Sequence, residues 1–218
     1  MLSDEGSVVI RKFGILNTNV PPDVKRFYGI PFPGQYLIAP DGTVKDKLFL
    51  EDYRERSTAS EIVLRDFGVS GNSATIKAED ITVTVALSGS TAVGGRRLGV
   101  TAEFEIAAGW HIYGEPLPSG YTATSIIFGD DLVAVQTLKF PQPHMVDFKN
   151  LGETLPVYNG KLKAAGYIVL RQTLKPGEYR LSGTIHFQEC SESVCQIPRA
   201  IKFELPLRID SQTGPAKV

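Results

Sequence analysis

The chain has little of what marks membrane proteins, nucleic-acid binders or metalloproteins. Its 218 residues include two cysteines, three histidines and a net charge of −1. No run approaches the ~20 apolar residues of a membrane-spanning helix, and no excess of one charge favours nucleic acid or an anionic membrane. The first residues lack the basic start and apolar core of a signal peptide. We therefore expect no nucleic-acid partner and no direct insertion into a membrane.

Residues 1–68 have the pattern of a mixed α/β segment. Apolar side chains recur at helical spacing in residues 3–14 and 57–68. Ser3 or Asp4 can cap the first of these helices, and the second begins at Ser57 or Thr58 and ends at Gly68. Residues 34–50 indicate two strands joined by a Pro-Asp-Gly turn.

Residues 75–210 have the pattern of a β domain. Seven strand-length segments, each bounded by turn-forming residues, occur at 81–87, 98–106, 124–128, 132–138, 164–170, 179–187 and 201–209. Short strands at this spacing, without a helical period, predict an antiparallel β-sandwich. We expect residues 69–74 to be a linker and residues 211–218 a tail, so that the whole protein is mainly β.

The two cysteines, Cys190 and Cys195, are separated by four residues. A strand precedes the first and another follows Pro198, so we expect the pair to lie across a hairpin, where opposed Cα atoms are about 4.5–5.5 Å apart and a disulfide is easy to form. Such a bond would add roughly 2 kcal/mol as a structural crosslink, against ~4.7 kcal/mol for a loop of about 100 residues. Redox use is therefore favoured, and a local structural disulfide stays open.

A metal site is the weakest interpretation of the pair. Zinc usually takes four ligands, and the chain has no second pair of cysteines, while His111, His144 and His186 are scattered along the sequence. We therefore expect no metal and no organic cofactor.

The segment GTIHFQECSESVCQIPR resembles the active-site hairpin of the N-terminal periplasmic domain of the thiol:disulfide interchange protein DsbD. Phe187, Gln188, Cys190, Cys195 and Pro198 match the order of that motif, with four residues between the cysteines where the best-known member has five. The resemblance covers residues 75–210. It implies an immunoglobulin-like sandwich, with Cys195 as the exchanging cysteine and Cys190 as the one that resolves mixed disulfides.

The resemblance also implies surroundings for the pair. A cap loop shields it in the family, and Phe148 is the candidate for the shielding phenylalanine. His111 and Tyr113 fall where family members have aromatic residues beside the pair, although ordinary strand packing is the alternative. Glu189 and Glu192 flank the cysteines, where carboxylates would raise the pKa of the thiols unless both simply face water.

Residues 1–68 resemble the C-terminal half of thioredoxin-fold peroxiredoxins. Pro33, before the GQYLI strand, matches the proline that is cis in that fold. The half that carries a redoxin's reactive cysteine has no counterpart here, so we expect Met1 to be an internal methionine or the gene to be truncated. The segment would then lack strands that its sheet needs.

The leading interpretation is a module that exchanges thiols and disulfides with thioredoxin-like proteins and a membrane electron-donor domain. Its location would be the periplasm or another part of the bacterial envelope. The alternatives are a non-enzymatic binding module with a structural disulfide, and the remainder of a peroxiredoxin–DsbD-like fusion.

Overall fold

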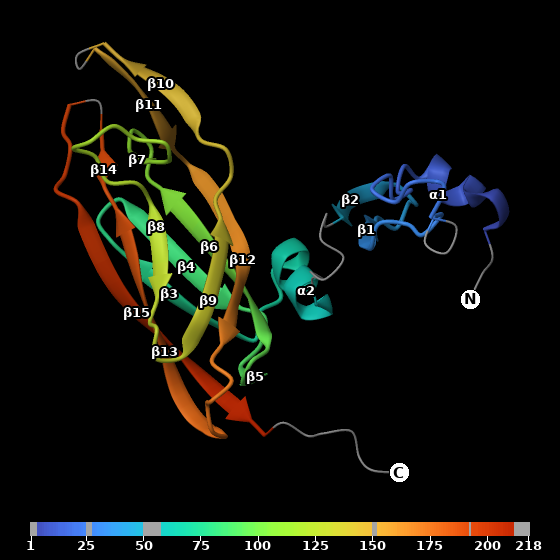
Figure 1. Cartoon of the computed structure of the whole chain (residues 1–218). Helices are drawn as coiled ribbons and strands as arrows, with labels where there is room; N and C mark the ends of the chain where they lie inside the picture. Colours follow the sequence, from blue (N-terminus) through green and yellow to red (C-terminus); the bar gives the residue numbers. More distant parts are fainter. Residues whose placement is uncertain (1–3, 25–27, 50–57, 150–151, 192, 212–218) are drawn as a thin grey trace. The chain divides into compact units, whose positions relative to one another are not determined.

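The computed structural model describes residues 4–24, 28–49, 58–149, 152–191 and 193–211 (Figure 1). The chain forms two compact units, Met1–Ser57 and Thr58–Val218. From the sequence we expected this boundary after residue 68. Because the division lies before Thr58, the helix expected at 57–68 belongs to the second unit.

The described part of the first unit has two helical segments and one hairpin. Its elements are η1 (Glu5–Ser7), α1 (Val8–Lys12), β1 (Gly34–Ile38) and β2 (Val44–Phe49). The carboxylate of Asp4 accepts hydrogen bonds from the backbone N–H groups of Val9 and Ile10, which otherwise lack partners at the start of a helix. The predicted strand–turn–strand is confirmed, because β1 and β2 pair antiparallel.

The prediction of a cis-proline at Pro33 is wrong. The cis peptide bond recorded among the described residues is Glu115–Pro116. A trans X–Pro bond is favoured by about 0.5–1 kcal/mol unless the fold imposes the cis form, and in the described part of this unit β1 pairs with β2 alone. This two-stranded sheet does not show the thioredoxin-like half that the resemblance implied.

The second unit is a β-sandwich with a third, smaller sheet at one end, at the top of Figure 1. One layer has the order β3-β4-β6-β12-β9 and the other β5-β15-β13-β8. The small sheet has the order β10-β11-β7-β14. The elements of the unit are α2 (Ala59–Phe67), β3 (Asn72–Lys77), β4 (Ile81–Leu87), β5 (Thr91–Val93), β6 (Arg97–Ile106), β7 (His111–Tyr113), β8 (Ser125–Phe128), β9 (Val133–Lys139), β10 (His144–Phe148), β11 (Glu153–Tyr158), β12 (Lys161–Leu170), β13 (Gly177–Phe187), β14 (Glu189–Cys190) and β15 (Arg199–Asp210).

The core lies between the two layers and follows from alternation along the strands. In β4, Ile81, Val83 and Val85 are buried while Thr82 and Thr84 between them are not. In β13, Leu181 and Ile185 are buried in the same way. Side chains alternate between the faces of a strand, so both layers turn one apolar face inward. The seven predicted strands and the mainly β fold are confirmed.

Helix α2 packs against β6 and β12 of the sandwich, so it is part of the second unit. Thr58, one of the two predicted caps, forms a capping box with Glu61, and the helix ends as predicted at Gly68, which is in the left-handed conformation. Leu64 is 1% exposed. A Cβ at Gly99 would lie 2.7 Å from Glu61 Cγ, so this close approach of the helix to β6 requires a glycine. β3 begins at Asn72, within the segment 69–74 that we expected to be a linker.

Candidate functional site

The small sheet brings the two cysteines together with the aromatic residues predicted to surround them. β14 pairs antiparallel with β7, so that Cys190 lies opposite His111. Residues two apart share a face of a strand, which puts Tyr113 on the same face as His111. Cys190, Tyr113, Leu155 and Val157 form a second buried cluster, separate from the main core.

Cys190 and Cys195 form a disulfide with their Cα atoms 4.1 Å apart. The two residues make an isolated antiparallel bridge, which confirms the expected cross-strand placement. Their environments differ sharply, because Cys190 is 0% exposed whereas Cys195 is exposed. One sulfur is therefore covered and its partner faces a cavity.

Hydrogen bonds fix the segment between the cysteines at both ends. Gln188 accepts through Oε1 from the Thr122 backbone N–H (3.0 Å) and donates through Nε2 to the Gln196 carbonyl (3.2 Å). The Gln196 N–H donates to the Glu189 carbonyl, and the turn itself is closed by Ser191 N–H donating to the Val194 carbonyl. Gln188 is thus a structural bridge beneath the loop. Glu192, the other flanking glutamate, lies outside the described residues.

Tyr113 contacts both sulfur atoms. Its hydroxyl donates to Cys190 Sγ at 3.2 Å and lies 3.5 Å from Cys195 Sγ. Burial raises the pKa of Tyr113, and the negative charge of Glu153 adds to the shift. The hydroxyl therefore keeps its proton and can act as a donor to either sulfur.

A second tyrosine, which the sequence analysis did not select, supports Tyr113. The Tyr121 ring lies edge-on to Tyr113 with 5.1 Å between the ring centroids. Its hydroxyl donates to Glu153 Oε2 at 2.7 Å, and this bond to a carboxylate raises the pKa of Tyr121 to about 12. Only the glycine before Tyr121 set it apart in the sequence, so no pattern pointed to this role.

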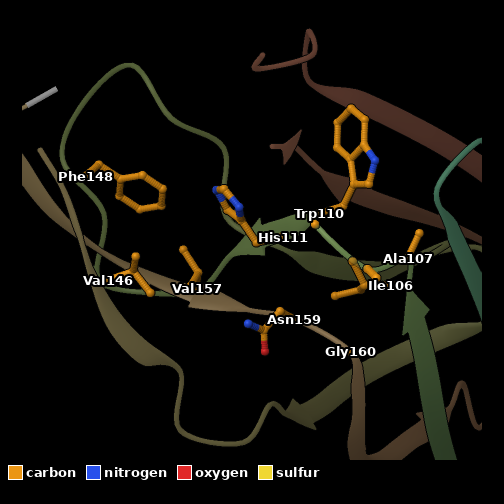
Figure 2. Close-up of a pocket in the computed structure, with 11 residues that line it drawn as sticks. Ile106, Ala107, Trp110, His111, Val146, Phe148, Val157, Asn159 and Gly160 are labelled. Carbon is orange, nitrogen blue, oxygen red and sulfur yellow. The ribbon is translucent and has the colours of Figure 1, made fainter. Parts of the chain in front are cut away.

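Phe148 and His111 lie on the walls of two cavities, one of which reaches Cys195. Their ring centroids are 5.1 Å apart, and Figure 2 shows the His111 ring between those of Phe148 and Trp110. Both residues line a cavity of about 710 Å³ that also reaches Cys195, and both line a second cavity of about 490 Å³ that extends towards Trp110 and Asn159.

The buried imidazole of His111 has no hydrogen-bond partner at Nε2 in the part of the chain that the structure describes. Burial lowers its pKa, because an apolar environment disfavours the charged form. His111 is thus neutral near pH 7, and it packs edge-on to Tyr113 with 5.5 Å between the ring centroids.

Glu189 lies differently from either sequence-based expectation. The Glu189 side chain does not face water, because the residue is 1% exposed. Adjacent residues of a strand point to opposite faces, so Glu189 points away from the side of β14 that carries the Cys190 sulfur. Its Oε1 forms an ion pair with Arg199 Nη1 at 3.3 Å. Burial raises the pKa of Glu189, partly offset by Arg199, with Asp80 and Glu79 adding to the rise.

The described residues offer no metal site, since no three of their histidine, cysteine, aspartate or glutamate side chains gather as ligands would. Within the same ranges, no helix has the length and apolar character needed to cross a bilayer.

Two N-terminal domains are among the solved structures that are similar to this chain. The N-terminal periplasmic domain of ScsB from Proteus mirabilis is 15% identical with a TM-score of 0.47, and the match covers 64% of this chain and 51% of that one. The reduced N-terminal domain of DsbD from Neisseria meningitidis is 17% identical with a TM-score of 0.33, covering 61% of this chain and 82% of that one. The chain thus spans about half the length of the first structure.

No curated protein sequence matches the chain. A family model does match it, over residues 81–207, and its description is the N-terminal domain of the thiol:disulfide interchange protein DsbD. These residues are more than half of the chain and contain both cysteines. The disulfide between Cys190 and Cys195 fits a thiol–disulfide exchange module, and the chain belongs to the family of DsbD N-terminal domains.

Proposed function

We propose that this protein passes electrons between redox partners through the Cys190–Cys195 pair. The observation that carries the proposal is the asymmetry of the disulfide. Cys195 is exposed beside a cavity, whereas Cys190 is fully buried and accepts a hydrogen bond from Tyr113. A crosslink with a purely structural role needs no such difference in access.

The exchange begins with both cysteines reduced. The Cys195 thiolate attacks one sulfur of a partner's disulfide, which forms a mixed disulfide and releases the other partner sulfur as a thiolate. The Cys190 thiolate then attacks Cys195 Sγ and expels the remaining partner sulfur. The partner gains two electrons and two protons, and the Cys190–Cys195 disulfide is restored.

Tyr113 and Phe148 have distinct parts in this proposal. The Tyr113 hydroxyl donates to whichever sulfur carries negative charge, since a hydrogen bond to the charged form favours it. Phe148 acts as the cap over the cavity that reaches Cys195 and limits access until a partner displaces it. The support for this role is the position of its ring on the wall of that cavity, packed against His111.

The partners are proposed to be thioredoxin-like proteins and a membrane electron-donor domain, in the bacterial periplasm or envelope. The family description and the word periplasmic in the name of the ScsB domain support this placement. Residues 1–68 remain proposed to derive from a redoxin, on the sequence resemblance alone.

Single-cysteine variants test the function. Cys190→Ser should accumulate a mixed disulfide with an oxidised thioredoxin-like protein, visible on non-reducing gels, because the resolving thiol is missing. Cys195→Ser should trap little, because its remaining thiol is buried. The double serine variant controls for non-covalent association. Trapping by Cys195→Ser alone would exchange the two roles, and trapping by neither variant would leave the pair as an inert structural bond.

A further inference from the structure

A second link, not covalent, joins the chain on either side of the two cysteines. Glu189 directly precedes Cys190, and Arg199 is the first residue of β15, directly after Pro198. Their ion pair spans 3.3 Å. The ion pair joins residues 189 and 199, so it encloses the segment that the disulfide closes between residues 190 and 195.

The Glu189 side chain has an unusual environment for a carboxylate. Both of its oxygen atoms are buried and neither has a hydrogen-bond partner among the described residues. Arg199, whose side chain is 29% exposed, supplies the positive charge, and its Nη2 also lies 3.3 Å from Glu79 Oε2. A carboxylate is costly to bury unless a charge of opposite sign compensates it, so Glu189 depends on Arg199 staying in place.

We propose that Glu189 and Arg199 are positioning residues that hold the two thiols within reach of each other after the disulfide is reduced. The proposal rests on the exchange function proposed above. Its basis is the placement of the pair at the two ends of the cysteine segment.

The physical argument concerns the reduced state. Once the S–S bond is broken, the segment is held by the turn at Ser191, the backbone hydrogen bond from Gln196 to Glu189, the bridge made by Gln188 and the Glu189–Arg199 pair. The stability of an intramolecular disulfide depends on how often its two thiols meet, which is their effective concentration. A looser segment lowers that concentration and makes the disulfide easier to reduce.

The test is the equilibrium constant for oxidation of the full chain by glutathione, in which the protein dithiol and oxidised glutathione give the disulfide and two reduced glutathiones. Glu189→Gln keeps the size of the side chain and removes its charge, and Arg199→Gln removes the partner charge. Each should lower the oxidation constant about fivefold. This change is at the upper end of the free energy that an ion pair partly open to solvent contributes. This corresponds to about 20 mV for a two-electron couple.

The double variant Glu189→Gln/Arg199→Gln should show no larger change than either single variant, because the two residues form one link. Arg180→Gln is the matched control, since Arg180 and Glu204 pair at 3.5 Å between β13 and β15 while both are exposed. Its oxidation constant should stay within about twofold of the wild type.

The signs of the changes separate positioning from a direct charge effect on the thiols. A direct effect gives opposite signs, since removing the negative Glu189 favours a thiolate and removing the positive Arg199 disfavours it. Positioning gives the same sign for both variants. Opposite signs, additive changes, or changes no larger than those of Arg180→Gln would each overturn the proposal.

Folding and function are controlled separately. Circular dichroism of the oxidised variants reports whether they fold. If Glu189→Gln does not fold, the comparison of the oxidation constants of Arg199→Gln and Arg180→Gln decides the outcome. A wild-type disulfide that reduced glutathione does not measurably reduce would argue against the exchange function itself. Equal constants in a reducible wild type and its variants would reject only the positioning role.

Discussion

Replacing Tyr113 by phenylalanine removes one hydroxyl from the redox site and keeps the ring. Among the described residues of the oxidised protein, this hydroxyl has only sulfur acceptors, at 3.2 Å and 3.5 Å, and sulfur accepts weakly. We therefore expect the free energy of unfolding of the oxidised protein to fall by no more than about 1 kcal/mol. The ring stays buried in the cluster with Leu155 and Val157.

In the reduced protein the same hydroxyl can donate to a thiolate. Hydrogen bonds to charged groups contribute about 1.5–3 kcal/mol, and one pKa unit corresponds to about 1.4 kcal/mol. Tyr113→Phe should therefore raise the lower of the two apparent thiol pKa values by about one to two units. Ultraviolet absorbance of the thiolate, followed against pH in the reduced protein, measures this value for the coupled pair.

Tyr179→Phe is the control for this experiment, since the Tyr179 hydroxyl donates to the Lys175 carbonyl, a backbone partner unconnected with the cysteines. It should leave both thiol pKa values unchanged. An unchanged thiol pKa in Tyr113→Phe would refute the donor role. A loss of several kcal/mol in the oxidised form would show instead that the hydroxyl serves the packing.

Three further predictions concern the cap, the buried histidine and the two units. Phe148→Ala should speed alkylation of the reduced pair at least severalfold while Phe148→Leu does so less, and equal rates would rule Phe148 out as the cap. Burial lowers the pKa of His111 below its usual 6.5, so the imidazole binds more protons in the unfolded chain than in the folded one. The free energy of unfolding should therefore fall as the pH drops from 6.5 through the lowered pKa. His111→Phe should flatten this part of the curve of unfolding free energy against pH, and an unaltered slope would contradict the assignment. Residues 58–211 should unfold cooperatively without residues 1–57. Residues 1–57 alone should fold poorly, and a well-ordered monomer formed by them would disprove this expectation.

The sandwich was predictable because its strands are long and alternate. The segment 81–87 matches β4 residue for residue, since a buried strand with threonine on its outer face has a clear period of two. The alternation of apolar and polar residues did not identify the strands of the small sheet. β7 and β14 span three and two residues, which is too short for any period, and β10 has two exposed residues at its start.

The candidate site was predictable where the chemistry lies in the side chains themselves. The pairing of Cys190 with Cys195, and the nearness of His111, Tyr113 and Phe148 to them, came from the family motif and from position along the chain. Tyr121 and Arg199 reach the site only through strand pairing and loop closure, which local sequence does not encode. Pro33 shows the opposite error, in which a local motif implied a backbone geometry without the surrounding fold to impose it.

Glu189 shows most clearly why register matters more than proximity in sequence. Its position next to Cys190 suggested a direct effect on the thiols. In β14, however, Cys190 lies opposite His111 and Glu189 opposite Ile112, so that the two side chains enter different layers of the protein. Ile112 belongs to the main core and Cys190 to the smaller cluster. A shift of one residue in this short pairing would bury the carboxylate among the aromatic rings and turn the sulfur towards Arg199, so the charge of Arg199 also favours the register that keeps Cys190 beneath Tyr113.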